Sequence, residues 1–246
     1  MKNAYKKYLF ENKSFGNLEF FIDPQTFTPT QTTLSIIKSS LNSIYDGDEI
    51  LDLGCGCGVV AITIANLNKN KLSLFASDIS DTVEEIVNLN AKKHNVQIEV
   101  RRSDIFDAWE GFKFNTIIND ISGVAEAVAK ISPWFKNISC DTGIGGSNLI
   151  NKVLKQSPDF LHQNGRLIFP IISFSNEKEI LELAHEVYGN VKLLQKDLWP
   201  APKELLDNMD LLKQLKKDGL ISFEEKFGSV IGYTAVYEAS RPINKN

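Results

Sequence analysis

A short apolar run that contains one acidic residue, Asp52, passes directly into a loop with three alternating glycines. Residues 50–65 read ILDLGCGCGVVAITIA, so Gly54, Gly56 and Gly58 follow the apolar run, and helical periodicity resumes after them. Glycine allows a backbone to approach a ligand closely and to adopt the conformations of a tight turn. The pattern therefore predicts a buried strand, a ligand-binding loop and a helix in succession.

Two further aspartates follow later apolar segments. Asp78 and Asp104 are separated by the same number of residues as Asp52 and Asp78. We expect one carboxylate at the end of each of three successive strands, which is where open α/β sheets bind ligands. This set suits a sulfonium nucleoside. Asp52 would face its ammonium group or the start of the helix, Asp78 would accept from both ribose hydroxyls, and Asp104 would accept from the adenine amino group.

Two other types of site fit the loop less well. A dinucleotide fingerprint reads G-x-G-x-x-G, whereas here the third glycine comes one residue early and an acid precedes the first. Cys55 and Cys57 are too close together for a zinc site, and no CxxC pair or paired histidines accompany them. The predicted cofactor is therefore S-adenosylmethionine, no metal is expected, and the two cysteines are interpreted as small loop fillers.

Predicted strands and helices alternate along most of the chain. Such alternation predicts an α/β fold, with a doubly wound, mostly parallel seven-stranded sheet and helices on both faces. The expected strands are 18–22, 50–53, 72–76, 96–100, 116–118, 137–140, 166–172, 221–225 and 230–238. Helices are expected from Thr28-Pro29, after Gly58, from a capping box at Asp81, over 123–131, and around Leu149–Leu154.

Composition narrows the class of protein further. The chain has 246 residues, of which 43% are hydrophobic, and a net charge of −4, so no global attraction to nucleic acid or to an anionic membrane is expected. The N-terminus has no signal-peptide pattern, no membrane-spanning run is found, and only three cysteines occur. We expect a cytoplasmic protein with an N-terminal extension at 1–27 and a main domain at 28–246. Within it, an insert at 199–219 would determine specificity or form the contact of a homodimer.

Three segments resemble the first motifs of class I S-adenosylmethionine-dependent methyltransferases, namely residues 50–65, 75–80 and 102–106. The resemblance implies a Rossmann-like methyltransferase fold. Segments 23–33, 90–94 and 142–150 resemble the HemK-like branch, whose best-known members methylate glutamine in translation release factors. The cofactor-binding residues expected on this basis are Asp52, Gly54, Cys55, Gly56, Gly58, Asp78, Ile79, Ser103, Asp104, Ile105 and Asn119.

The sequence departs from that branch where the methyl acceptor would bind. The branch carries Asn-Pro-Pro-Tyr after the fourth strand, whereas residues 120–123 of this chain read DISG. Asp120 is the best candidate for a base or an amine-orienting carboxylate, with Asn119 beside it, and a strand-end cap or a cofactor contact is the alternative for Asp120. The acids of the branch's glycine-rich stretch are replaced by Ile144 and Gly145.

The sequence is therefore compatible with three functions. The first is a methyltransferase acting on a nitrogen or oxygen of a small molecule or a protein side chain. The second is a HemK-like glutamine methyltransferase acting on a translation factor or ribosomal component, and the third is a catalytically silent subunit that binds the cofactor. Candidate substrate-binding residues are Thr30, Ser122, Trp134 and Trp199, and packing in the core is the alternative for the two tryptophans.

Overall fold

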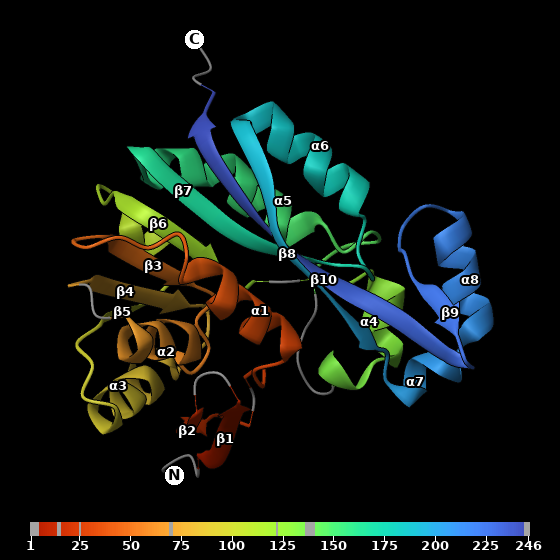
Figure 1. Cartoon of the computed structure of the whole chain (residues 1–246), viewed down its shortest axis with the longest axis horizontal. Coiled ribbons are helices and arrows are strands. Elements are labelled where there is room, and N and C mark those ends of the chain that lie inside the picture. The colour runs from red at the N-terminus through yellow and green to blue at the C-terminus, as the bar shows by residue number, and fades with distance from the viewer. Residues whose placement is uncertain are drawn as a thin grey trace. The chain divides into compact units, whose positions relative to one another are not determined.

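The computed structural model describes residues 5–13, 16–24, 26–68, 71–121, 123–135 and 141–243 (Figure 1). The chain divides into two compact units. The first comprises Met1–Asp120 with Asp159–Ile168, and the second comprises Ile121–Pro158 with Phe169–Asn246. Because the residues of the glycine loop and all three aspartates belong to the first unit, the predicted cofactor site can be described within that unit alone.

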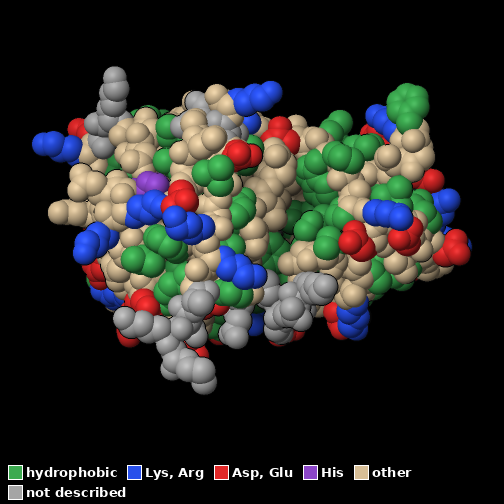
Figure 2. All heavy atoms as spheres, turned by 90° about the horizontal axis from the view of Figure 1, so that it is seen from below, with side chains coloured by type: hydrophobic (Ala, Val, Ile, Leu, Met, Phe, Trp, Pro, Cys, Tyr) green, Lys and Arg blue, Asp and Glu red, His purple; other side chains and the backbone are tan. Residues whose placement is uncertain are grey.

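The surface carries charges of both signs. On the face shown in Figure 2, Lys and Arg side chains are interspersed with Asp and Glu side chains. Within the described part of the chain, no helix combines the length and the apolar character that a membrane crossing requires.

The first unit is built on parallel strands in the order β5-β4-β3-β6-β7. These strands are β3 (Glu49–Leu53), β4 (Ser73–Asp78), β5 (Glu99–Arg102), β6 (Phe114–Asn119) and β7 (Leu161–Ile172), the last of which continues into the second unit. In the register of the sheet, Leu53 lies beside Ser77 on one side and Asn119 on the other. The carboxyl ends of β3, β4 and β6 therefore meet at one edge of the sheet.

Three helices accompany this sheet. They are α1 (Gln31–Ser40), α2 (Val59–Leu67) and α3 (Val83–Lys93), and a short 3-10 turn covers Asp107–Trp109. Helix α2 packs against β3 and β4, helix α3 packs against β5, and α1 contacts α2. The α2 sequence VVAITIANL is apolar all round and buried over its first two turns, as expected of a helix inside a core.

The N-terminal residues form an antiparallel hairpin, with β1 (Lys6–Asn12) paired with β2 (Gly16–Ile22). The hairpin packs on α3 through Asn90, which is fully buried. The Asn90 amide donates to the Phe21 carbonyl oxygen at 2.8 Å and accepts from the Phe21 N–H at 2.7 Å. A side-chain amide can match both groups of a backbone in this way, so Asn90 fastens β2 to the helix.

The second unit contains helices α4 to α8 and strands β8 to β10. Strand β10 pairs antiparallel with both β8 and β9, and the larger sheet has eight described strands in the order β5-β4-β3-β6-β7-β10-β8, with β9 beside β10. The elements are α4 (Glu126–Ile131), α5 (Asn148–Gln156), α6 (Glu177–Val187), β8 (Tyr188–Pro200), α7 (Lys203–Leu206), α8 (Met209–Lys217), β9 (Glu224–Lys226) and β10 (Ser229–Pro242), with 3-10 turns at Pro133–Phe135 and Ser157–Phe160.

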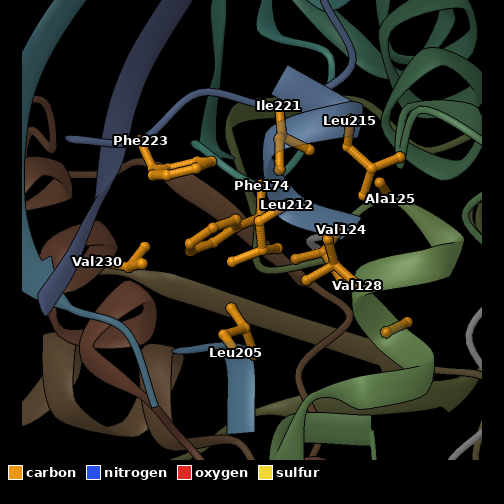
Figure 3. Packing of buried hydrophobic residues seen from close by; sticks show 11 residues of the cluster. Val124, Ala125, Val128, Phe174, Leu205, Leu212, Leu215, Ile221, Phe223 and Val230 are labelled. Carbon is orange, nitrogen blue, oxygen red and sulfur yellow. The ribbon is translucent and has the colours of Figure 1, made fainter. Parts of the chain in front are cut away.

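A hydrophobic cluster joins α4, α7 and α8 in the second unit (Figure 3). Phe174 lies in its middle, 6.5 Å from the ring of Phe223 and 5.7 Å from that of Trp199. The amphipathic helix α8 contributes Leu212 and Leu215 to this cluster. The insert predicted at 199–219 therefore consists largely of two helices that bury their apolar faces in the second unit.

The predicted fold class is confirmed, because the structure has a mostly parallel sheet with helices in an α/β arrangement. The sheet has eight described strands, whereas seven were expected, since the short β9 pairs with β10. Thr30 caps α1, so the helix begins later than the Thr28-Pro29 pattern predicts. The expected capping box at Asp81 is also wrong, because the N-cap of α3 is Thr82 and makes no side-chain cap bond. The strand expected at 137–140 lies outside the described residues.

Candidate functional site

The glycine loop adopts the left-handed backbone conformations that its sequence predicts. The φ angles are 75° at Gly54, 52° at Gly56 and 80° at Gly58. Gly58 is the N-cap of α2, and a Cβ there would lie 2.9 Å from a methyl group of Val87. A Cβ on Gly56 would meet no atom within 4 Å. Gly58 is thus required by packing, whereas the backbone of Gly56 borders open space.

Asp78 connects the end of β4 to this loop. One carboxylate oxygen accepts the N–H of Gly56 at 2.9 Å, and the other accepts the N–H of Ser80 at 3.0 Å. The carbonyl oxygen of Ser77 accepts the N–H groups of Gly54 and Cys55. Each carboxylate oxygen can accept a second hydrogen bond, so Asp78 can hold the loop and still accept from the hydroxyls of a ribose.

Asp52 is a fully buried carboxylate with one unused oxygen. Its Oδ2 accepts the N–H of Ala61 at 3.0 Å, and its Oδ1 has no hydrogen-bond partner among the described residues. The pKa of Asp52 is raised to about 7, chiefly by burial; the bond from Ala61 opposes this shift, and the charge of Asp78 adds to it. An orphaned buried carboxylate oxygen is costly unless a donor or a cation reaches it, so Asp52 suits a cationic ligand.

Asp120 follows Asn119 at the end of β6 and is held at two points. Its N–H donates to the carbonyl oxygen of Leu53 at 2.9 Å, and its Oδ2 accepts from the hydroxyl of Thr33 at 3.0 Å. Burial raises the pKa of Asp120 to about 8, the charge of Asp52 adds to this shift, and the bond from Thr33 opposes it. A partly exposed carboxyl with this pKa can take up or release a proton near neutral pH.

The third motif is linked to the second through the backbone. The N–H of Ser103 donates to the carbonyl oxygen of Asp78 at 2.9 Å, and the Ser103 hydroxyl donates to the carbonyl oxygen of Ile105. Ile105 has a positive φ of 50°, which is uncommon for a β-branched residue and marks a constrained turn. Asp104 and Ile79 are exposed beside it, and 63% of the Ile79 surface is accessible. An exposed apolar side chain here can cover the face of an adenine ring.

The sheet register and these hydrogen bonds bring most of the expected cofactor residues together at one edge of the first unit. The carboxylates supply negative charge for a sulfonium and an ammonium group, and the glycine loop supplies space, so the residues fit S-adenosylmethionine. The residues brought together are Asp52, Gly54, Cys55, Gly56, Gly58, Asp78, Ser103, Asn119 and Asp120.

The two cysteines of the loop are buried and reduced. Burial raises the pKa of the Cys57 thiol to about 12 and that of the Cys55 thiol well above its usual range. A neutral, buried thiol is a poor nucleophile and a poor metal ligand. The geometry thus agrees with their interpretation as small side chains that fill the loop.

The candidate substrate residues are distributed over both units, and their role stays a prediction. Thr30 caps α1 by accepting the N–H of Thr32. In the second unit, the rings of Trp134 and Trp199 pack edge to face with their centroids 5.7 Å apart, and both side chains are partly exposed. Ser122 lies outside the described residues.

Two side chains that form hydrogen bonds within the candidate site are not predicted from the sequence. Thr33 bonds to Asp120, and Asn90 donates to the Cys57 carbonyl oxygen at 2.9 Å and so supports the glycine loop. Both residues lie in segments that resemble HemK-like proteins, but the resemblance assigns no role to either side chain. A threonine beside a cap and an asparagine inside a helix carry no spacing signal of their own.

Gly123, where the HemK-like branch has tyrosine, is tightly packed within the second unit. A Cβ at this position would lie 2.5 Å from Thr142 Cγ2 and 2.7 Å from the carbonyl oxygen of Gly146. The Thr142 hydroxyl also donates to the carbonyl oxygen of Val124 at 2.6 Å. Any side chain at position 123 would therefore overlap Thr142 and the backbone of Gly146.

Comparisons with known proteins agree with this geometry. Residues 30–120 match the model of the methyltransferase small domain. A ribosomal protein uL3 glutamine methyltransferase from Francisella tularensis subsp. tularensis (strain SCHU S4 / Schu 4) is 26% identical over 174 residues, which are 67% of this chain and 55% of that protein. The chain thus aligns with little more than half the length of this relative.

Solved structures show the same fold at low sequence identity. A 16S rRNA methyltransferase from T. thermophilus, in complex with AdoMet and guanosine, has a TM-score of 0.60 at 13% identity, covering 96% of this chain and 51% of that one. A ribosomal protein L11 methylase from Lactobacillus delbrueckii subsp. bulgaricus has a TM-score of 0.52 at 17% identity, covering 87% and 82%. The predicted resemblance to class I methyltransferases is confirmed, and the comparisons support S-adenosylmethionine as the cofactor.

Proposed function

We propose that this chain, which resembles class I S-adenosylmethionine-dependent methyltransferases, transfers a methyl group to a nitrogen acceptor that carries an N–H. The observation that carries the proposal is the group of carboxylates around the glycine loop. The Oδ1 atom of Asp52 is buried without a hydrogen-bond partner among the described residues. The Asp78 carboxylate accepts the N–H of Gly56 in the glycine loop, and Asp120 follows the neighbouring strand β6.

The cofactor, when bound, supplies a methyl group activated by its positive sulfur. In the proposed mode, Asp78 accepts from the ribose hydroxyls and Asp104 from the adenine amino group. Asp52 contributes negative charge beneath the glycine loop, and Ile79 covers the adenine. Much of the rate of such an in-line displacement comes from aligning the acceptor atom with the methyl group. The main task of these residues is therefore to hold the two reactants in that alignment.

Asp120 is proposed to bind the acceptor N–H. In the transfer, the nitrogen lone pair forms the new N–C bond while the S–C bond breaks and its electrons remain on sulfur. The proton leaves the nitrogen to the Asp120 carboxylate and then to solvent. A pKa of about 8 places Asp120 in the range in which it can accept a proton from an amine. A carboxylate acceptor would be repelled by Asp78 and, at pH values above their raised pKa, by Asp52 and Asp120 as well.

The identity of the acceptor molecule is a further part of the proposal. The Francisella relative is named for a ribosomal protein, which favours a protein side chain and a cytoplasmic location. Without the Asn-Pro-Pro-Tyr clamp, a side-chain or small-molecule amine fits residues 120–123 better than the planar amide of glutamine does. Glutamine methylation, RNA methylation and a silent cofactor-binding subunit are therefore outcomes that the test must separate.

The test is a methyl-transfer survey. Purified protein is incubated with methyl-labelled S-adenosylmethionine and a cell extract, which is then separated into metabolite, protein and RNA pools. Label on an amine in the metabolite or protein pool, lost in Asp120→Ala, supports the proposal. Label on glutamine or RNA would refute the amine acceptor, and tight cofactor binding without label in any pool would support the silent subunit.

A further inference from the structure

We propose that Thr33 is a positioning residue for methyl transfer, because its hydroxyl fixes the orientation of the Asp120 carboxylate. The inference rests on the proposed function, since it assigns a support to the residue that would bind the acceptor. The two residues lie far apart in the sequence, and the bond between Thr33 Oγ1 and Asp120 Oδ2 measures 3.0 Å.

The hydroxyl of Thr33 takes part in two hydrogen bonds with different roles. It accepts the N–H of Thr30 at 3.3 Å, which completes the capping box of α1. Glutamate or glutamine usually occupies this position of a capping box and reaches the same N–H. A threonine hydroxyl also has a proton to donate, which a glutamate carboxylate lacks. In this chain that proton is directed at Asp120.

The position of Thr33 makes this contact a rigid one. Thr33 is buried in the first turn of α1, so its side chain has few alternative conformers and little competition from water. The backbone of Asp120 is anchored separately by its bond to Leu53. With backbone and carboxylate both fixed, one oxygen of Asp120 is occupied by Thr33 and the other is left for the acceptor.

Other charged groups also act on Asp120. The negative charges of Asp52 and Asp78 raise its pKa, whereas the bond from Thr33 lowers it. The Cys57 thiol interacts electrostatically with Asp52 and Asp120, but it stays neutral because burial raises its pKa. Removing the Thr33 hydroxyl leaves these groups in place, so the pKa of Asp120 should rise.

The experiment measures Asp120 directly in the full-length protein. Aspartate labelled with ¹³C at the carboxyl group is followed by NMR as a function of pH, and Asp120→Asn assigns the signal. In Thr33→Val, we expect the pKa of Asp120 to rise by about half a unit to one unit. The methyl-transfer kcat should fall about tenfold, with the KM for S-adenosylmethionine within about twofold of wild type. Thr33→Ser, which keeps the hydroxyl, should restore both.

Further variants of α1 distinguish an effect on the orientation of the Asp120 carboxylate from an effect on the stability of the helix. Ser35→Ala removes a buried hydroxyl of α1 that donates to the Gln31 carbonyl oxygen, so it should lower the melting temperature without moving the Asp120 titration. Thr33→Ala provides a second variant if Thr33→Val does not fold. An unchanged Asp120 titration in a folded Thr33 variant would overturn the inference. The proposed function fails separately, if the wild-type protein neither binds the cofactor nor transfers label.

Discussion

The backbone N–H of Gly56 donates to the Asp78 carboxylate at 2.9 Å, so the tip of the glycine loop is fastened to the end of the next strand. The same carboxylate is the proposed ligand of the ribose. Cofactor recognition and loop conformation therefore depend on one side chain, and a change at Asp78 should affect both.

Replacing Asp78 by alanine should weaken binding of S-adenosylmethionine by about 30- to 100-fold. The loss corresponds to about 2–3 kcal/mol, which is typical when hydrogen bonds to a charged group are removed. Isothermal titration calorimetry measures the change. Asp81→Ala is the matched control, because Asp81 is an exposed acid nearby that pairs with Arg102 and does not touch the loop. Unchanged affinity in Asp78→Ala would refute the ribose assignment.

Replacing Asp52 by asparagine should stabilise the ligand-free protein at pH 8 while weakening cofactor binding. The pKa of Asp52 is raised from 3.8 to about 7, so the folded state retains a proton that the unfolded state has lost. Stability is therefore lost as pH rises from about 4 through about 7, by an amount on the order of a few kcal/mol, and asparagine removes this loss. Asparagine can still accept the N–H of Ala61 through its carbonyl oxygen.

Urea denaturation at pH 5.5 and pH 8 checks this expectation. The free energy of unfolding of the wild type should be lower at pH 8, and the difference between the two pH values should be smaller in Asp52→Asn. Asp120 contributes to the wild-type trend with the same sign, because burial raises its pKa as well. A variant that is destabilised more at pH 8 than at pH 5.5 would contradict the buried, protonated state of Asp52.

Replacing Asn90 by alanine should lower both stability and cofactor affinity. The change leaves the Phe21 N–H, the Phe21 carbonyl oxygen and the Cys57 carbonyl oxygen without the partner that they have in the wild type. Unpaired buried backbone groups cost about 1–3 kcal/mol each, so we expect a loss of roughly 3 kcal/mol after partial relaxation. Thermal unfolding and calorimetry measure the two effects.

Asn88→Ala is the control for Asn90, since its exposed amide donates within the same helix, to Glu84. It should change the melting temperature by no more than a degree or two, as is usual for exposed substitutions in a domain of this size. If Asn90→Ala reduces stability but leaves the affinity for the cofactor unchanged, the glycine loop does not depend on this helix.

Introducing at position 123 the tyrosine that the HemK-like branch carries should destabilise the protein instead of improving catalysis. A Cβ at Gly123 would lie 2.5 Å from Thr142 Cγ2 and 2.7 Å from the Gly146 carbonyl oxygen, and the latter belongs to the backbone. Even Gly123→Ala should therefore cost more than about 2 kcal/mol, as other overpacked sites do. Gly189→Ala, whose Cβ would make an ordinary contact at 3.4 Å, is the control in chemical denaturation.

The sequence was sufficient for the parts of the fold whose patterns are local. The strand–glycine–helix segment around Asp52 and the strand ending at Asp78 were predicted because apolar runs and glycines mark them directly. Strand β8 was not predicted, since its outer residues are mostly exposed and polar, and its pairing with the distant β10 decides its conformation. The helix α6 before it was missed as well.

In the candidate site, too, the features with local sequence patterns could be predicted and those that depend on tertiary contacts could not. Carboxylates at strand ends could be predicted because parallel strands end at one edge of a sheet. The support of Asp120 by Thr33 could not be predicted, because it depends on a tertiary contact between the first turn of α1 and the residue after β6, and no sequence spacing encodes that contact. That Trp134 and Trp199 belong to the second unit likewise follows from how the chain is divided, which composition alone does not reveal.

The burial of Cys55 and Cys57 turns the glycine loop into a chemical reporter of its own opening. Both thiols are held neutral and away from solvent, so an alkylating reagent such as iodoacetamide can modify them only when the loop separates from β4. In a Cys140→Ser background, the rate of alkylation therefore measures how often the loop opens. A cofactor that bridges the loop and Asp78 would protect both cysteines, which gives an assay for occupancy that needs no knowledge of the methyl acceptor.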